Sequence, residues 1–266
     1  MRRLCLFLVY FLSFDIAAAE KLSFRSEVLP SNFTANIGGE LAFPKGNGPF
    51  PVVILLHPCG GLDPIGLATL QAHSRELLSN GFGTLILDSY GPRNLARGKA
   101  CKTFPTGSLR RSDAFNARAA LQSHAKIRKD NIYLLGLSDG GNAAIISARG
   151  GGAAGDFRAV AAYYPACHIL QGGTGYSSPV IVFVGEKDDW TPAAECMKTT
   201  NPPGGVELKV VSYPNAHHGF DQQHAPRRYL GHTLAHDREA TADSRRKYLE
   251  FFRKYLTPAS NSALPK

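Results

Sequence analysis

Ser138 lies in a Gly-x-Ser-x-Gly pattern that is typical of a serine nucleophile. The pattern runs from Gly136 to Gly140, after the apolar residues 132–135 and before a stretch of small residues. A serine hydroxyl is a weak nucleophile at neutral pH, so it must stand clear of the sheet, beside a base and near amide donors. A sharp strand-to-helix turn achieves this, and flanking glycines let neighbouring backbone pass close by. Because an ordinary glycine-rich turn can show the same pattern, its context has to support the interpretation.

An acid follows Ser138 in the order that such a nucleophile requires. The apolar run 180–184 ends in a polar loop that holds Glu186, Asp188 and Asp189. We favour Asp188 as the residue that orients a histidine, because it lies three residues beyond the glycine that ends the strand. A solvated loop charge or a helix N-cap is the alternative for each of these side chains taken alone.

Histidines come after the acid, as a general base in this arrangement should. The strand expected over residues 206–213 leads into His217 and His218, and we expect one of them to be the base. His57 is a second candidate. Since the base belongs after the acid in this order, we favour for His57 a structural role in which its ring bonds nearby backbone.

Acyl transfer also needs amide donors that stabilise an oxyanion. The apolar run 52–56 leads into the loop 57–61, whose glycines allow backbone amides to turn toward a ligand. We expect one donor to be the amide of Asp139, directly after the serine. The other should be the amide of Cys59 or Gly60.

Together these motifs resemble the dienelactone hydrolase family, a branch of the α/β-hydrolases. In that family the acid lies four residues before a proline and the base two residues before a phenylalanine. The resemblance therefore selects Asp188 over Asp189 and His218 over His217. It extends over about residues 39–255 and includes segments 57–61, 88–93, 136–140, 185–192 and 216–220.

The chain departs from the family's pattern at one position, and this departure bears on the substrate. Dienelactone-cleaving members have cysteine where this chain has Ser138, and serine suits general ester hydrolysis, so the family's own lactone substrate is not carried over. The expected substrate class is a small-molecule ester or lactone. The family's carboxylate-binding arginines point to Arg93 as the best candidate, with Tyr90 and Trp190 as further substrate contacts. An exposed or backbone-bonded loop arginine is the alternative for Arg93.

The first 19 residues are typical of a secretory signal peptide. Arg2 and Arg3 precede the apolar stretch 4–14, and the alanines at 17–19 supply a small-residue cleavage site before Glu20. The apolar stretch is short for a membrane span, and no later segment approaches the necessary length. We therefore expect an exported, periplasmic or secreted protein without a membrane span.

Cysteine usage agrees with export, because removing Cys5 with the signal leaves an even number that could form two disulfides. We favour pairing Cys167 with Cys196 and Cys59 with Cys101, since Cys167 and Cys196 should lie at one end of adjacent strands. Four buried free thiols are the alternative. No zinc-ligand spacing such as CxxC or HExxH occurs, and we expect neither a metal nor a cofactor.

Hydrophobic patterning predicts a single α/β domain over residues 20–256. Its apolar runs alternate with helical stretches, which indicates a doubly wound, mainly parallel sheet with helices on both faces. The resemblance implies that this is an α/β-hydrolase fold with little or no cap domain. We expect strands at residues 52–56, 83–87, 132–135, 160–164, 180–184 and 206–213.

Other segments complete the expected domain. Helical spacing predicts helices at 67–80, from Ser112 as a cap to residue 124, at 142–148 and at 238–255. We expect the remaining segments to form an antiparallel edge hairpin at 22–43, a turn at 129–131 and a mobile tail at 257–266.

The formal net charge is +9, but the positive residues are scattered along helices. This favours solvated helix faces over a nucleic-acid partner, and no nucleic-acid-binding motif occurs. We therefore predict an exported serine hydrolase that cleaves carboxylic esters through an acyl-enzyme. A polyester depolymerase or peptidase with the same triad is one alternative, and a non-catalytic exported binding protein on a hydrolase fold is another. The natural substrate and the oligomeric state stay open.

Overall fold

The computed structural model describes residues 19–28, 33–95, 101, 107–150, 155–171, 175–199 and 206–258. All but the last residue of the predicted signal peptide lies outside these ranges. The same is true of residues 259–266 in the predicted tail.

Within the described residues, an eight-stranded sheet forms the centre of the molecule, in the order β1-β2-β4-β3-β5-β6-β7-β8. The strands from β3 to β8 run parallel, and β1 and β2 form an antiparallel hairpin that extends the sheet beyond β4. This confirms the mainly parallel sheet and the edge hairpin. The strands are β1 (Glu20–Val28), β2 (Phe33–Ala42), β3 (Phe50–Leu56), β4 (Gly83–Asp88), β5 (Ile127–Leu137), β6 (Val160–Tyr163), β7 (Val180–Gly185) and β8 (Leu208–Tyr213).

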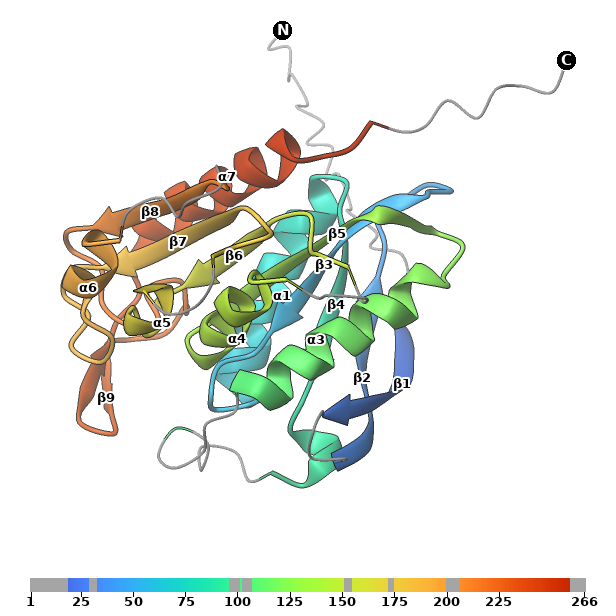
Figure 1. The fold of residues 1–266 in the computed structure, drawn as a ribbon. Coiled ribbons are helices and arrows are strands. Elements are labelled where there is room, and N and C mark those ends of the chain that lie inside the picture. The colour runs from blue at the N-terminus through green and yellow to red at the C-terminus, as the bar shows by residue number, and fades with distance from the viewer. Residues whose placement is uncertain are drawn as a thin grey trace, which may run out of the picture.

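Helices cover both faces of this sheet (Figure 1), as the doubly wound prediction requires. Ile54 packs with α3 and α4 on one face, while its neighbours Val53 and Leu55 pack with α1 and α7 on the other. Because both faces are buried, residues 52–56 of β3 and 132–135 of β5 form apolar runs. The helices are α1 (Pro64–Ser79), η1 (Gly91–Arg93), α3 (Gly107–Gln122), α4 (Asp139–Ser147), α5 (His168–Gln171), α6 (Ala193–Met197) and α7 (Arg238–Lys254).

A short hairpin lies between β8 and α7, at the carboxyl edge of the sheet. It consists of β9 (Arg227–Tyr229) and β10 (His232–Leu234), and Leu234 forms a bridge with His218.

Three helix starts differ from their predicted positions, and one of them is the helix predicted from residue 142, which begins at Asp139. The helix predicted to begin at Ser112 begins at Gly107, so Ser112 is an interior residue and not a cap. The helix predicted from residue 67 begins at Pro64, where the Asp63 carboxylate accepts a hydrogen bond from the Gly66 amide. In α1 and α3 the first turn has few apolar residues at helical spacing, so a prediction from hydrophobic spacing places the start of the helix too late.

The predicted turn at residues 129–131 is part of β5. Phe50 pairs with Ile127 and Val52 pairs with Ile132, so an irregularity in the ladder absorbs the extra residues. Lys129 and Asp130 stay exposed, which is why their composition resembles that of a turn.

Thr257, the first residue of the predicted mobile tail, is tied to β5. Its amide donates to the Asn131 side chain at 2.8 Å, and its carbonyl accepts from Arg128.

The described residues include two disulfides, Cys59–Cys101 and Cys167–Cys196, in the pairing favoured from the sequence. Their Cα atoms are 5.0 and 4.8 Å apart, within the usual range. Because disulfides persist in oxidising compartments, they indicate a non-cytoplasmic protein. Over the residues placed by the structure, no helix combines the length and apolar character needed to cross a membrane.

Candidate active site

Ser138 lies on the sharp turn between β5 and α4, with φ 53° and ψ −116°. Residues with side chains rarely adopt positive φ, so the turn stores strain. A Cβ atom on Gly136 would lie 2.0 Å from the Gly140 carbonyl oxygen, and one on Gly140 would lie 2.4 Å from that of Leu56. Close approach of backbone therefore requires both glycines of the pattern.

His218 and Asp188 form a continuous hydrogen-bonded chain with this serine. The Nε2 atom of His218 is 3.0 Å from Ser138 Oγ, and its Nδ1 atom is 2.8 Å from Asp188 Oδ2. An ionised carboxylate only accepts, so Nδ1 carries the hydrogen and Nε2 is left to accept from the hydroxyl. The three residues follow β5, β7 and β8, and parallel strands bring their carboxyl ends to one edge of the sheet.

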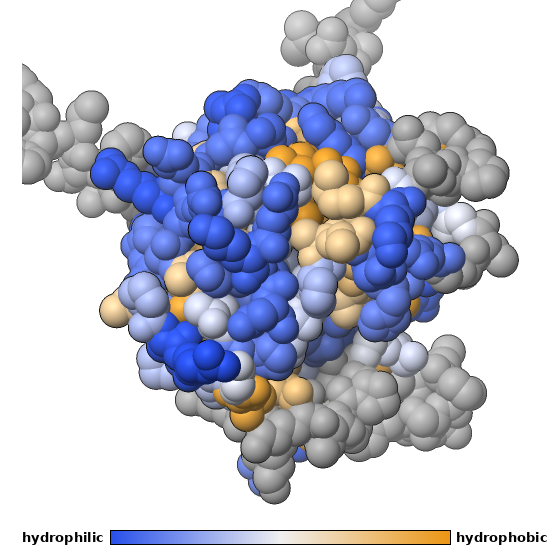
Figure 2. Space-filling model, turned by 90° about the vertical axis from the view of Figure 1, so that its left-hand side faces the viewer, coloured by the Kyte–Doolittle hydropathy of each residue, from blue (hydrophilic) through white to orange (hydrophobic). Residues whose placement is uncertain are grey.

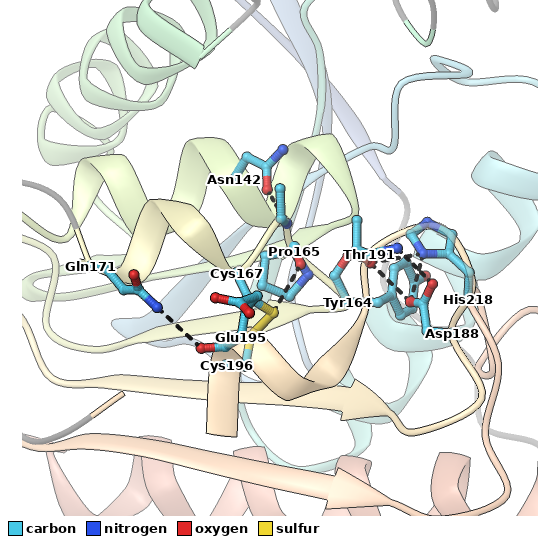
Figure 3. Close-up of a disulfide and its surroundings, with 11 residues drawn as sticks. Asn142, Tyr164, Pro165, Cys167, Gln171, Asp188, Thr191, Glu195, Cys196 and His218 are labelled. Atoms are coloured by element: carbon cyan, nitrogen blue, oxygen red, sulfur yellow. Dashed lines mark hydrogen bonds and ion pairs between the residues drawn. A yellow bond between two sulfur atoms is a disulfide. The ribbon is translucent and has the colours of Figure 1, made fainter. Parts of the chain in front are cut away.

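The loop of Asp188 holds its carboxylate in place. The amides of Trp190 and Thr191 each donate to Oδ1 at 2.8 Å, and the Thr191 hydroxyl donates to Oδ2 at 2.9 Å. Burial alone would raise the pKa of Asp188, but the His218 contact and these amides outweigh it and lower the pKa. The carboxylate therefore stays ionised beside the imidazole. Figure 3 shows this cluster near the Cys167–Cys196 disulfide.

The other acids of the same loop make different contacts. Asp189 accepts from the Thr233 amide at 2.9 Å and from its hydroxyl at 3.2 Å, which ties the loop to β10. Glu186 accepts from the Ser212 hydroxyl at 2.9 Å. Of the three candidate acids, the structure brings Asp188 to the histidine.

A small cavity of about 40 Å³ opens beside Ser138. Cys59, Gly60 and Trp190 line it together with His218, and the Trp190 ring stacks on His232 with centroids 4.8 Å apart. Its outer wall includes Arg227 and Tyr229 from the β9–β10 hairpin.

The face toward which the carboxyl ends of β7 and β8 point in Figure 1 is mostly hydrophilic, with smaller hydrophobic areas (Figure 2). Among the residues whose positions are described, no group of three or more His, Cys, Asp or Glu side chains is arranged to hold a metal ion.

We correct the expected substrate contacts of Arg93 and Tyr90, which do not line the cavity. The buried guanidinium of Arg93 binds Asp113 through two contacts of 2.7 Å and donates to the Ser89 carbonyl at 2.8 Å. Tyr90 is 1% exposed, and its hydroxyl donates to the Asp139 carboxylate at 3.0 Å. Both side chains turn inward, Arg93 to its partner Asp113 on α3 and Tyr90 to its partner Asp139 on α4.

His57 has the structural role favoured from the sequence. The Ser89 amide donates to its Nε2 at 3.3 Å, so Nδ1 carries the hydrogen and donates to the Pro58 carbonyl at 2.8 Å. Burial, assisted by the positive charge of Arg110, lowers the pKa of His57 to about 3. The ring is therefore neutral at physiological pH.

Sequence reasoning missed two buried polar groups near the site. Arg110 is fully buried in α3 and binds both Asp139 and the His57 carbonyl. Nothing in its sequence context distinguishes it from the neighbouring Arg111, which is only half-buried and donates to the Gly150 carbonyl.

The other missed group lies behind the His218 loop. Asp221 accepts from His73 Nε2 at 2.7 Å and from the Tyr164 hydroxyl at 2.7 Å. The Tyr164 ring packs on His218, with centroids 4.7 Å apart. The only signal in the sequence is an aspartate three residues after the base.

Comparisons with known proteins agree with this architecture. The sequence model of the Dienelactone hydrolase family matches residues 37–256. A dienelactone hydrolase-like promiscuous phosphotriesterase from metagenomic libraries has a similar structure, with a TM-score of 0.65 and 18% identity over 91% of this chain and 100% of that one. A sequence comparison with curated proteins finds no match.

Two further solved structures are similar. Dienelactone hydrolase from Anabaena variabilis has a TM-score of 0.63 and 18% identity over 90% of this chain and 99% of that one. Thermogutta terrifontis esterase 2, phosphorylated by paraoxon, has a TM-score of 0.61 and 16% identity over 90% and 96%. At such identities these likenesses show the fold, whereas the family match spans most of the chain.

Proposed function

Since the chain belongs to the dienelactone hydrolase family and is a carboxylic ester hydrolase, we propose that Ser138, His218 and Asp188 are its catalytic triad. One geometric feature carries this proposal: the unbroken contacts of 3.0 and 2.8 Å that join the serine hydroxyl through the imidazole to a buried carboxylate. The strained turn at Ser138 and the adjoining cavity support it.

In the proposed reaction, His218 Nε2 takes the hydroxyl proton while Ser138 Oγ attacks the ester carbonyl carbon. The carbonyl electron pair moves to oxygen, and the oxyanion accepts hydrogen bonds from the amides of Asp139 and of Cys59 or Gly60. The carbon–oxygen bond to the alcohol then breaks, and His218 returns its proton to the leaving oxygen. Water, deprotonated by the same imidazole, attacks the acyl-enzyme and releases the acid.

Replacing the nucleophile tests the assignment directly. We expect Ser138→Ala to lower kcat on p-nitrophenyl acetate by about 10⁴-fold or more and to abolish labelling by a fluorophosphonate probe. A folded Ser138→Ala protein that keeps its esterase activity would disprove the assignment.

Two adjacent aspartates offer a matched test of the acid. We expect Asp188→Asn to lower kcat by roughly 10⁴-fold, because the imidazole then loses its orientation and tautomer. Asp189→Asn should change kcat less than about threefold, since that carboxylate contacts Thr233 and not the imidazole. Equal losses in the two variants would contradict the proposed role of Asp188.

We propose a small-molecule ester as the substrate, because the cavity at Ser138 is bounded by Trp190 and the β9–β10 hairpin. Short-chain aryl esters should be turned over faster than polyester films or peptide amides. The opposite ranking would favour the depolymerase or peptidase alternative. Paraoxon should phosphorylate Ser138, as it phosphorylates the similar Thermogutta esterase.

We also propose that residues 1–19 are a signal peptide and that residues 20–256 form the exported hydrolase domain. The two disulfides and the start of β1 at Glu20 support this division. Protein recovered from the periplasm or medium should begin at Glu20 by mass spectrometry. An intact amino terminus on recovered active protein would contradict it.

A further inference from the structure

We propose that Arg110 is a positioning residue that holds the two backbone segments of the oxyanion hole in register. The inference rests on the triad and oxyanion donors proposed above. Arg110 belongs to α3, contributes nothing to the triad and has a fully buried side chain. A buried guanidinium is costly unless its hydrogen bonds are satisfied, so its partners indicate what it holds.

One guanidinium joins the two segments. Its Nη1 atom donates to the Asp139 carboxylate at 2.8 Å, and its Nη2 atom donates to the His57 carbonyl. Asp139 directly follows the nucleophile, and His57 lies two residues before Cys59. Thus a single planar group spans the loop after β3 and the first turn of α4, from which the oxyanion donors come.

Neighbouring groups stiffen this connection. The Tyr90 hydroxyl donates to the same Asp139 oxygen at 3.0 Å, and the Arg110 guanidinium lies over the Tyr90 ring, 5.4 Å from its centroid. His57 is neutral and anchored through both ring nitrogens, to Pro58 and to the Ser89 amide. Two backbone amides can stabilise an oxyanion only if their separation is maintained, and displacements near 1 Å cost about 10²-fold in rate.

Charge provides a second reason for this contact. The Asp139 carboxylate belongs to the residue whose amide faces the developing oxyanion, and an uncompensated negative charge there would oppose the transition state. Arg110 neutralises it within a buried ion pair. The same arginine therefore fixes Asp139 and offsets its charge.

Arg110→Gln tests the proposal through transition-state binding. We expect kcat on p-nitrophenyl acetate to fall by about 10²-fold, while KM changes less than about threefold. Affinity for 2,2,2-trifluoroacetophenone, which forms a tetrahedral adduct with the serine, should weaken by a similar factor. The midpoint of the pH dependence of kcat/KM should not move, because His218 and Asp188 are untouched.

The chain offers a matched control in Asp113→Asn. Asp113 lies on the same helix and forms a buried pair with Arg93, and these 2.7 Å contacts include neither Asp139 nor His57. We expect this variant to lose stability but to keep kcat within about threefold of wild type. Loss of kcat in Asp113→Asn equal to that in Arg110→Gln would show a general packing effect and overturn the proposal.

Tyr90→Phe gives a second route if Arg110→Gln does not fold, because it removes only the hydroxyl bond to Asp139. Its kcat should fall about threefold to tenfold at constant KM. Unchanged kcat and unchanged ketone affinity in the folded variants would overturn the proposal. Ser138→Ala separates the two hypotheses: if labelling depends on Ser138 while these variants stay fully active, the role of Arg110 alone is wrong.

Discussion

At Gly140 the backbone passes so close to the end of β3 that the methyl group of an alanine would clash with it. A Cβ atom there would lie 2.4 Å from the Leu56 carbonyl oxygen and 2.6 Å from that of His57. We expect Gly140→Ala to cost roughly 1–3 kcal/mol of unfolding free energy, measured in urea, and to depress esterase activity because the displaced carbonyls precede the oxyanion loop.

Gly81→Ala is the control for Gly140→Ala. Gly81 has φ +86°, but no heavy atom lies within 4 Å of the position that an added methyl group would take, so only backbone strain opposes alanine there. We expect a loss of about 1 kcal/mol with normal activity. If Gly140→Ala were as stable and active as Gly81→Ala, close approach would not explain the glycine.

The buried His57 gives stability a defined pH dependence. Its pKa is about 3 in the folded state and 6.5 ordinarily, so between these values the unfolded chain binds a proton that the folded chain does not. The contribution of neutral, buried His57 to the free energy of unfolding is fully present above pH 6.5 and is lost as the pH falls toward 3. The total loss is on the order of 5 kcal/mol.

Denaturation of wild type and His57→Gln at several pH values tests this linkage. Between pH 4 and 6 the unfolding free energy of the variant should fall less steeply, by about 1.4 kcal/mol per pH unit. Above pH 7.5 the two slopes should agree. Burial lowers the pKa of His73 as well, so some slope of the same sign will remain in His57→Gln. Identical slopes below pH 6 would contradict the assignment.

At the scale of elements, the two disulfides connect different parts of the molecule, and only one of them lies at the cavity. Cys167–Cys196 joins the segment after β6 to α6, whereas Cys59–Cys101 anchors the loop that lines the cavity. They span 42 and 29 residues for Cys59–Cys101 and Cys167–Cys196 respectively, so chain entropy predicts similar stabilisation of about 3–4 kcal/mol each.

Paired alanine variants should separate stability from activity. We expect Cys167→Ala/Cys196→Ala to lower stability while keeping most of kcat at a temperature where it is folded. Cys59→Ala/Cys101→Ala should lose similar stability and also several-fold in kcat, because the loop of a proposed oxyanion donor is released. If the two double variants lost different amounts of stability but had the same kcat, these separate roles for the two disulfides would be contradicted.

At the scale of the whole molecule, two cores on opposite faces of one sheet bring distant segments to a single edge. The residues after α7 bind back to segments at the amino ends of β8 and β5. Tyr255 donates to Glu207 at 2.5 Å and Thr257 binds Asn131 at 2.8 Å, so the last contacts of the described chain run back to the sheet.

Truncations should locate the end of the folded domain. Removing residues 259–266 should leave Tm within about 1 °C of wild type, whereas removing everything after Lys254 should cost about 2 kcal/mol through the lost Tyr255 and Thr257 contacts. Equal Tm values for the two truncations would show that the terminal contacts do not stabilise the domain.

Strand positions were predictable because each central strand is a short, uninterrupted apolar run, and periodicity is a local property. Ser138, Asp188 and His218 could also be chosen as candidates from the sequence, because their order along the chain is visible there. Helix starts were less predictable, as at Ser112, because a first turn need not carry apolar residues. The irregularity in β5 could not be read from Lys129 and Asp130, whose exposure depends on how β3 pairs.

The roles of the buried polar side chains could not be obtained in this way. Arg110 reaches a carbonyl 53 positions away, and His73 reaches a carboxylate 148 positions away. Arg93 was assigned to the substrate because its loop position suited that role, whereas its partner lies on α3.

By itself, the sequence determined the fold class and the candidate nucleophile, since apolar periodicity, turn glycines and residue order are encoded locally. Only the tertiary structure decided which polar groups are solvated and which are buried in pairs. That choice depends on desolvation, and desolvation is set by every element packed around a side chain and not by its neighbours in the chain.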